Sequence, residues 1–448
     1  MKNMQFAVIG HPIGHTMSPF IHTRLFSLSG IQGKYTAADV SPKALKAFLN
    51  RRNDWNGFNI TIPHKHAIIP CLDALDKKAM MTGSVNTVKI EDGKLTGFTT
   101  DGDGFRLALK SAGVPLEGRV VILGAGGAAR ALAFEAALAG CRVTVAARQH
   151  SLAAAKKLSA SLIRAIPEIH ADACLISDVV GKADLLVNAT PAGMYPNLKS
   201  CAAGEELILR ASCVFDAVYN PDQTALIRLA KKNGVPAVGG MAMLVWQAAA
   251  AQTIWTGAQF ETGEMDHLCQ DAILEMKKNF GNIVLCGFMG SGKTTIGNLI
   301  AKQTGRRFVD MDAWIEQKQG RSVAEIFAAK GEDCFRALEQ DAARELALET
   351  GLVIATGGGT MLNSANVQAL KSSGIVVLLD ASLAAIQSRL EGDRTRPLLQ
   401  RKDRDSEMKR LYCERLPIYR NHADVTVSAD YSPEETAALV LKTLEPKY

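Results

Sequence analysis

The stretch Gly287-Phe-Met-Gly-Ser-Gly-Lys-Thr294 combines the residue types needed to hold a chain of phosphates. Its glycines let the backbone turn so that successive N–H groups and a helix N-terminus face one anion. Lys293 can then reach the β- and γ-phosphates, and the Thr294 hydroxyl can ligate Mg²⁺. Residues 283–286 before it are typical of a buried strand, and residues 295–301 after it have helical spacing. We therefore predict a site for a nucleoside triphosphate.

A second glycine turn, Gly124-Ala-Gly-Gly-Ala-Ala129, follows the apolar strand predicted at 119–123 and opens an alanine-rich helix. The next strand is predicted at 142–146, so the turn has the strand–turn–helix–strand setting of a dinucleotide site. An NAD enzyme carries an acid at the end of that strand, whereas this chain has Arg148 just beyond it. Because a cation suits the additional phosphate of NADP, we predict an NADP site.

Two polar side chains earlier in the chain are candidates for acid–base chemistry. Lys65 follows the strand predicted at 57–62, and strand ends in α/β folds are where ligands bind. Asp101 lies in a glycine-rich turn, where it could also be no more than a helix cap. His64 and His66 flank the lysine, but no third metal ligand is nearby, so surface histidines, or histidines that support neighbouring site residues, are favoured over a metal site.

The segment after the phosphate loop adds carboxylates and cations. Asp310 and Asp312 end a predicted strand on the same face, which suits one partner of Mg²⁺ and one base or hydroxyl binder. Arg336 and Glu339 share one face of a predicted helix at i, i+3. The basic loop 392–398 contains glycine and proline and is of the kind that closes over phosphates.

Composition narrows the class of protein. The chain has 448 residues, 47% of them hydrophobic and 21% charged, which is ordinary for a globular protein. No apolar run approaches the roughly 18 residues of a membrane span. The net charge of +6 is not gathered in a basic stripe, which argues against a nucleic-acid binder. The nine cysteines form no C-x-x-C pair, and the N-terminus does not resemble a signal peptide, so we expect reduced thiols and a cytoplasmic protein.

The alternation of short apolar runs with helical patterns predicts the α/β class with mostly parallel sheets. At about 150 residues per domain the length allows about three domains. We predict one substrate-binding α/β domain from 1–104 together with 242–278, and a Rossmann-like NADP domain at 105–241. A linker at 279–281 and a phosphate-loop domain at 282–448 follow.

Several spaced motifs show that residues 1 to about 275 resemble shikimate dehydrogenase. They are GHPIGHTMSP (10–19), NITIPHK (59–65), GSVNTV (83–88), TTDGDG (99–104), GAGGAA (124–129), NAT (188–190), DAVYNP (216–221) and GGMAMLVWQA (239–248). The resemblance implies NADPH-dependent reduction of 3-dehydroshikimate to shikimate, with Lys65 and Asp101 as the catalytic pair at the C3 oxygen. The implied substrate contacts are Thr16, Ser18, Thr61, Asn86, Asp101, Tyr219 and Gln247. The implied NADP contacts are Gly124, Ala125, Gly126, Gly127, Ala128, Arg148, Thr190, Ala217 and Gly240. Leu152 stands where the family often has a second basic residue, which leaves the strictness of NADP over NAD open.

From about residue 280 the chain resembles shikimate kinase, through GFMGSGKTT, VDMD, FRALE, TGGG, RTRPLL and RLPIY. The resemblance implies phosphorylation of shikimate by ATP, with Asp312 orienting or deprotonating the attacking hydroxyl and Lys293 and Arg396 neutralising the phosphoryl group. The implied shikimate contacts are Asp312, Arg336, Gly358 and Arg415. The implied ATP contacts are Gly290, Ser291, Gly292, Lys293, Thr294, Thr295, Arg389 and Arg396, and the implied Mg²⁺ partners are Thr294 and Asp310.

The two resemblances together predict a bifunctional enzyme for consecutive steps towards chorismate and the aromatic amino acids. One alternative is a quinate-preferring or NAD-using dehydrogenase fused to a kinase for another small alcohol. Another is a regulatory protein that senses both nucleotides without turnover, against which the intact Lys65, Asp101, Lys293 and Asp312 argue. The expected partners are small molecules, not nucleic acid or membrane, and a homodimer is left open.

Overall fold

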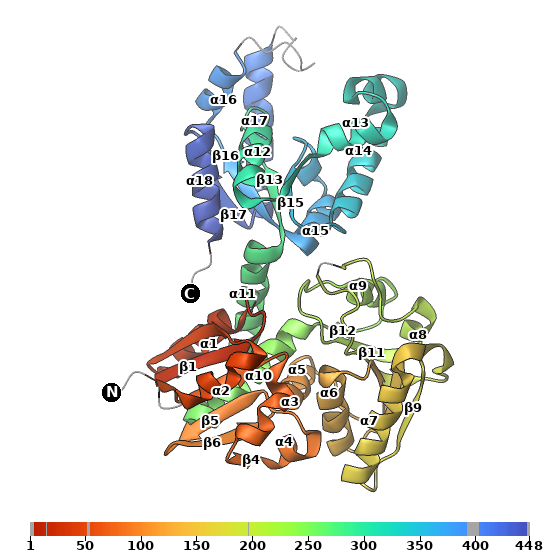
Figure 1. The fold of residues 1–448 in the computed structure, drawn as a ribbon. Coiled ribbons are helices and arrows are strands. Elements are labelled where there is room, and N and C mark those ends of the chain that lie inside the picture. Colours follow the sequence, from red (N-terminus) through yellow and green to blue (C-terminus); the bar gives the residue numbers. More distant parts are fainter. Residues whose placement is uncertain (1–3, 15, 52–53, 196, 392–402, 446–448) are drawn as a thin grey trace. The chain divides into compact units, whose positions relative to one another are not determined.

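The computed structural model describes residues 4–14, 16–51, 54–195, 197–391 and 403–445. This part of the chain forms two compact units, which divide between Ile273 and Leu274 inside helix α11 (Thr262–Phe280). Each unit is built around parallel strands, as Figure 1 shows, so the predicted α/β class is confirmed. The division into three domains with a linker at 279–281 stays a prediction.

The first sheet of unit 1, residues up to Ile273, is mixed, with strand order β2-β1-β3-β5-β6-β4. Strand β1 pairs in parallel with β2 and β3, whereas β5 is antiparallel to both β3 and β6. The β5–β6 hairpin was not predicted from the sequence, although Asp92-Gly93 marks its turn, with both residues at positive φ. The strands are β1 (Met4–Gly10), β2 (Gly33–Asp39), β3 (Gly57–Ile60), β4 (Ala74–Leu75), β5 (Thr87–Glu91) and β6 (Lys94–Phe98).

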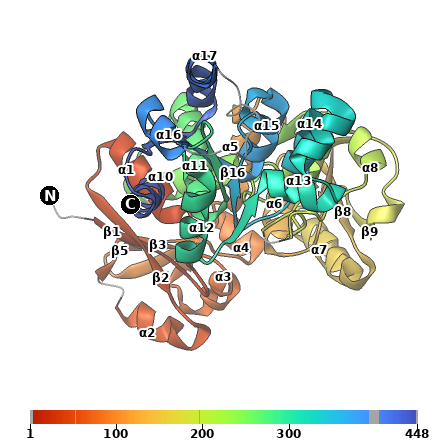
Figure 2. The ribbon, with the colours of Figure 1, turned by 90° about the horizontal axis from the view of Figure 1, so that it is seen from above.

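A helix from much later in the chain returns to this first sheet. Helix α10 packs along α5 and against α1, and helices α1 and α10 lie side by side in both views (Figures 1 and 2). At its C-terminal end Trp255 stacks on Phe6 with ring centroids 4.6 Å apart and donates from Nε1 to the carbonyl of Val88 at 2.9 Å. The helices are α1 (Ser18–Ser29), α2 (Leu45–Asn50), α3 (His64–Ala67), α4 (Lys77–Thr82), α5 (Asp101–Ser111) and α10 (Gly240–Thr256).

The second sheet of unit 1 is entirely parallel, with order β12-β11-β10-β7-β8-β9. Its central strands are apolar on both faces because helices cover both sides. The chain starts at the central β7 and extends first to one side and later to the other, which creates a switch point where ligands bind. The strands are β7 (Arg119–Leu123), β8 (Arg142–Ala147), β9 (Ala171–Leu175), β10 (Ala183–Asn188), β11 (Ala211–Asp216) and β12 (Ala237–Val238). The helices are α6 (Gly127–Leu138), α7 (Leu152–Ala165), α8 (Glu205–Leu209) and α9 (Ala225–Lys232).

Unit 2, from Leu274 onward, has one parallel sheet of order β14-β15-β13-β16-β17, with the first strand again in the middle. One continuous apolar core joins the sheet to the helices on its faces. The strands are β13 (Asn282–Cys286), β14 (Arg307–Asp310), β15 (Leu352–Ala355), β16 (Gly374–Asp380) and β17 (Val425–Ser428). The helices are α12 (Lys293–Thr304), α13 (Met311–Gln319), α14 (Val323–Leu346), α15 (Ser364–Ser373), α16 (Leu383–Arg389), α17 (Arg404–His422) and α18 (Pro433–Leu444). Among the described helices of both units, none has the length and apolar character needed to cross a membrane.

The contact between α5 and α10 leads to a prediction about stability. A Cβ at Gly104 would lie 2.6 Å from the carbonyl oxygen of Met243 and 2.7 Å from Cβ of Gln247. Gly104→Ala should therefore lower the free energy of unfolding of unit 1 by about 1–3 kcal/mol, because the two helices must move apart. Urea unfolding followed by tryptophan fluorescence measures the change. Gly263→Ala in α11 is the matched control, since a Cβ there meets nothing within 4 Å. Equal midpoints for the two variants would contradict the prediction.

Candidate functional sites

Unit 1 contains a cavity of about 520 Å³ between its two sheets, and Lys65 and Asp101 meet in it. Lys65 comes from the short helix α3 and Asp101 from the first turn of α5, and Lys65 Nζ donates to Asp101 Oδ2 at 2.5 Å. The side chain of Asp101 is only 8% exposed. Asp101 does not cap α5, because Thr100 is the N-cap residue and has no side-chain cap bond. The pair can therefore hold and move a proton at the wall of the cavity, with Asp101 largely shielded from solvent.

Asn86 fixes the orientation of the Asp101 carboxylate. Its Nδ2 donates to Asp101 Oδ1 at 2.8 Å, so both carboxylate oxygens are engaged. Its own Oδ1 accepts from the backbone N–H of Thr100 at 2.8 Å. The side-chain amide of Asn86 thus links the segment just before β5 to the start of α5.

Two hydroxyls face the cavity where helix α1 begins. Thr16 Oγ1 lies 3.1 Å from Ser18 Oγ, and Ser18 is the first residue of the helix after the N-cap residue Met17. Nearby His22 also lines the cavity and stacks on Tyr35 with ring centroids 4.0 Å apart. Burial lowers the pKa of His22 to about 3, so this part of the cavity is uncharged near neutral pH. An anion here would be held by hydroxyl groups.

Every substrate-binding residue predicted for unit 1 lies at this cavity, including Thr61, Tyr219 and Gln247. The cavity residues His11, Met194 and Leu244 were not predicted from the sequence, although His11 and Leu244 lie within the motifs at 10–19 and 239–248. His66 is exposed as predicted, whereas His64 is only 1% exposed and is therefore not a surface histidine. Each ring lies against a separate backbone carbonyl, that of Val40 for His64 and that of Gly83 for His66, at 2.6 Å.

A second cavity of unit 1, about 380 Å³, lies at the glycine turn after β7. Gly124, at φ +110°, packs against Thr190, where a Cβ would lie 2.9 Å from the threonine methyl. The turn leads into α6, whose first N–H groups have no partners within the helix. Arg148 also lines the cavity, and within the described chain no hydrogen bond or ion pair of its guanidinium is recorded. The arrangement suits a phosphate-bearing nucleotide.

The predicted nucleotide contacts of unit 1 fall into two groups. Gly124, Ala125, Gly126, Arg148 and Thr190 line this cavity. Gly127, Ala128, Ala217 and Gly240 do not line it. A Cβ at Gly240 would lie 2.6 Å from the carbonyl oxygen of Ala217, so the missing side chain lets α10 start directly against the segment after β11. The sequence analysis did not select His150, Ser151, Asn197 or Ser200, which also line the cavity.

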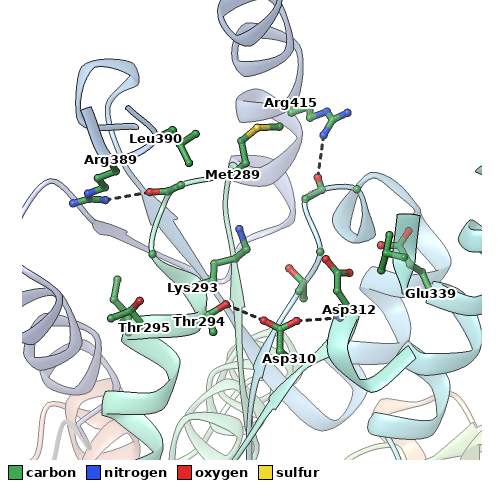
Figure 3. Close-up of a pocket in the computed structure, with 18 of the residues that line it drawn as sticks. Met289, Lys293, Thr294, Thr295, Asp310, Asp312, Glu339, Arg389, Leu390 and Arg415 are labelled. Atoms are coloured by element: carbon green, nitrogen blue, oxygen red, sulfur yellow. Dashed lines mark hydrogen bonds between the residues drawn. The ribbon is translucent and has the colours of Figure 1, made fainter. Parts of the chain in front are cut away.

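Unit 2 contains a cavity of about 700 Å³ above the phosphate loop (Figure 3). Lys293 projects from the start of α12 and donates to the carbonyl oxygens of Gly287 at 2.9 Å and Phe288 at 3.1 Å. Thr294 Oγ1 donates to Asp310 Oδ2 at 2.8 Å. Thr294 Oγ1 and Asp310 Oδ2 thus lie next to each other beside the phosphate loop, and Mg²⁺ prefers such oxygen ligands.

The prediction that Asp310 and Asp312 share one face of a strand is wrong. Strand β14 ends at Asp310, which is the N-cap of α13 and accepts from the N–H of Asp312 at 3.1 Å. Asp312 lies in the first helical turn and reaches the cavity from there (Figure 3). Burial, followed by the negative charges of Asp310 and Glu339, raises the pKa of Asp312 to about 6, against the opposing effect of Lys293. Its Oδ1 is buried without a hydrogen-bond partner in the described chain.

The far wall of this cavity carries fixed cations. Arg336 pairs with Glu339, which is 1% exposed and also accepts from Thr360 Oγ1 at 2.7 Å. Arg415 Nη1 donates to the carbonyl of Gly358 at 3.4 Å, and this contact is drawn in Figure 3. The two guanidinium groups therefore border the space in front of Asp312. Glu339 was noted only for its helical spacing, although it stands in the motif FRALE that carried the resemblance.

Arg389 borders the nucleotide side of the cavity. Its guanidinium donates to the carbonyls of Ala429 at 2.7 Å and Tyr431 at 3.2 Å. Of the other residues predicted to contact ATP, Ser291 is fully buried behind the loop and does not line the cavity. Arg396 lies outside the described residues. The remaining predicted contacts, Gly290, Gly292, Lys293, Thr294 and Thr295, all line it.

Comparison with known proteins agrees with both resemblances. Residues 8–88 match the shikimate dehydrogenase substrate binding domain, and residues 289–445 match shikimate kinase. The chain is 40% identical over 275 residues to the shikimate dehydrogenase (NADP(+)) of Moorella thermoacetica, which covers 60% of this chain and 92% of the relative. It is also 40% identical over 264 residues to the enzyme of the same name from Methanocaldococcus jannaschii, covering 58% and 93%.

Solved structures resemble unit 1 closely. The shikimate 5-dehydrogenase of Thermus thermophilus, in complex with NADP(H) and shikimate, superposes with a TM-score of 0.54 at 35% identity, covering 60% of this chain and 99% of that one. The quinate dehydrogenase of Corynebacterium glutamicum, in complex with NAD, gives 0.55 at 28% identity with coverages of 60% and 99%. The chain thus belongs to the shikimate dehydrogenase family through residues 1 to about 275 and continues into a shikimate kinase domain, which makes it a bifunctional shikimate-pathway enzyme.

Proposed function

We propose that unit 1 reduces 3-dehydroshikimate to shikimate with NADPH, and that unit 2 transfers a phosphoryl group from ATP to the hydroxyl formed by that reduction. The observation that carries the proposal is the same in both units. Each has a glycine turn at a central strand, and near it an acid–base group in a cavity: the Lys65–Asp101 pair in unit 1 and Asp312 in unit 2.

In unit 1 the residues bind the ring and supply a proton. Thr16 and Ser18 face the cavity as hydroxyl donors for the substrate carboxylate, while the side chains lining the rest of it hold the ring hydroxyls. NADPH, when bound, supplies the hydride to C3. Lys65 Nζ gives its proton to the C3 oxygen as that oxygen gains negative charge, and Asp101 keeps the ammonium group in place. The reduced carbon then carries the hydroxyl group.

The cavity at the second sheet fits the cofactor. Gly126 lines the cavity and has no atom within 4 Å of where a Cβ would stand, so a pyrophosphate can approach the backbone there, and the N-terminus of α6 favours negative charge. Arg148 provides a guanidinium for the ribose 2′-phosphate, which is the group that separates NADP from NAD. Its place directly after β8 supports this assignment.

In unit 2 the residues position the two reactants. Arg336, Arg415 and Gly358 surround the space for shikimate, and Asp312 orients its hydroxyl and accepts the hydroxyl proton. Lys293 neutralises charge on the phosphoryl group, a role we also assign to Arg396. Thr294 and Asp310 are suited to hold Mg²⁺, which neutralises phosphate charge when bound.

Separate substitutions should silence the two activities one at a time. Lys65→Ala removes the proton donor and should abolish reduction while phosphorylation continues at the wild-type rate. Lys293→Ala should do the reverse, because the two sites use different residues. Reduction is followed by NADPH absorbance and phosphorylation by a coupled ADP assay, with circular dichroism to show that both variants fold. Loss of both activities in either folded variant would contradict two independent sites.

Arg148→Ala tests the choice of cofactor. Loss of the guanidinium should raise KM for NADPH about tenfold or more, since a charge-assisted contact with the 2′-phosphate disappears. KM for NADH should stay within about twofold, because NADH lacks that phosphate. The matched control is Arg164→Ala on α7, outside the cavity. Equal losses with both cofactors would assign Arg148 another role.

The pH dependence of the kinase should reflect Asp312. Its pKa of about 6 means that the carboxyl becomes protonated, and so cannot accept a proton, as the pH falls through that value. We expect kcat/KM for shikimate to be constant between about pH 7 and 8 and to fall about tenfold for each pH unit well below 6. A profile without a change between pH 5 and 7 would contradict this role.

Asp312→Asn tests how the raised pKa of Asp312 affects the stability of the folded protein. The folded-state pKa of about 6 lies above the ordinary 3.8, so the folded protein carries the cost of an ionised, mostly buried carboxylate above pH 6. The variant should lack phosphorylation yet unfold at a higher temperature than wild type at pH 8. That gain should shrink as the pH falls from 6 towards 4. A less stable variant at pH 8 would show that the raised pKa is not the dominant effect.

A further inference from the structure

Four charged side chains from three helices meet in unit 1 at a place that the proposed chemistry does not use. Lys78 comes from α4, Asp103 and Arg106 from α5, and Glu135 from α6. Lys78 Nζ lies 2.7 Å from Asp103 Oδ1 and 3.0 Å from Glu135 Oε2. Arg106 Nε lies 3.0 Å from Glu135 Oε1. Two cations and two carboxylates thus balance each other.

Glu135 is the most buried member, with 6% of its side chain exposed. Its carboxylate lies against the first turn of α5, because a Cβ on Gly102 would come within 2.8 Å of Glu135 Oε2. Gly102 directly follows Asp101, and Asp103 is the next residue. The cluster therefore holds the same helical turn that presents Asp101 to Lys65.

Glu135 lies near the C-terminal end of helix α6, and the N-terminal end of the same helix starts at the nucleotide turn, at Gly127. Arg130 of the same helix donates from Nε to the carbonyl of Thr82 at the end of α4, which adds a second link to that side. Burial alone lowers the pKa of Lys78, but its hydrogen bond with Asp103 and the charges of Asp103 and Glu135 outweigh this and raise it. Lys78 therefore remains a cation between the two carboxylates.

We propose that Glu135 is a positioning residue for reduction. It locks the first turn of α5 to α6, and so sets both the distance between Asp101 and Lys65 and the position of this pair relative to the bound nucleotide. The inference rests on the proposed dehydrogenase function. Loss of one buried charge leaves its partners unbalanced, which displaces them. A displacement of about 1 Å in a reacting group can cost about a hundredfold in rate, so a small shift of Asp101 is measurable.

Glu135→Gln keeps the size of the side chain and removes its charge. We expect kcat for reduction of 3-dehydroshikimate to fall about tenfold, with KM for substrate and NADPH within about twofold of wild type. A role in stability alone would leave kcat unchanged in the folded fraction, whereas a displaced Asp101 lowers kcat without a matching change in KM.

Asp184→Asn is the control for a carboxylate outside the cluster. Asp184 is more exposed than Glu135, lies at the opposite end of strand β10 from the nucleotide turn and accepts from the N–H of Arg119 at 2.7 Å. Its replacement should leave kcat as in wild type. NADPH binding, followed by fluorescence, shows that the nucleotide site of each variant is intact.

Arg106→Gln is a second, milder variant, since the arginine side chain is 45% exposed and its loss should not prevent folding. It should lower kcat about threefold with KM within about twofold of wild type. A folded Glu135→Gln or Arg106→Gln protein with wild-type kcat overturns the inference. A wild-type enzyme that does not reduce 3-dehydroshikimate at all overturns the proposed function, and this inference with it.

Discussion

Unpaired backbone N–H groups at the start of a helix are the constraint on which both units depend. The first N–H groups of an α-helix have no partners within it, and they carry partial positive charge. Each unit turns such a helix start towards a cavity directly after its central parallel strand, through the glycine turn after β7 and the one after β13. The parallel sheets keep these strands buried on both faces, so each turn is anchored to a buried strand.

Both units share the glycine turn and helix start, but they differ in the charges of their acid–base groups. In unit 1 a cation and a carboxylate, Lys65 and Asp101, contact each other directly, and Asn86 engages the second carboxylate oxygen. In unit 2 Asp312 is mostly buried and lies near three other acids, Asp310, Glu339 and Glu316, which together raise its pKa. The first arrangement favours the donation of a proton to an oxygen that becomes an alkoxide. The second favours a carboxylate that takes up a proton from a hydroxyl.

Much of the fold and of the family could be predicted from the sequence, because the decisive signals are local. A glycine turn between a strand and a helix is set by neighbouring residues, and both such turns were located by spacing alone. The α/β class and the bifunctional shikimate-pathway enzyme are confirmed. The β5–β6 hairpin was missed because Asp92-Gly93 was not considered as a turn, and Asp312 was placed on a strand that ends two residues earlier. The residue roles themselves stay predictions.

The sequence by itself determined where the two nucleotides should bind and which chemistry each half should carry, since those depend on short contiguous motifs. The tertiary structure decided which distant side chains meet. Lys65 and Asp101 are 36 positions apart, and no periodicity relates them. Among the acids that raise the pKa of Asp312, Glu339 comes from another helix, and the cluster of four charges that includes Glu135 draws on three helices. Electrostatic energies depend on distance and burial in space, and only the packing of the elements fixes either.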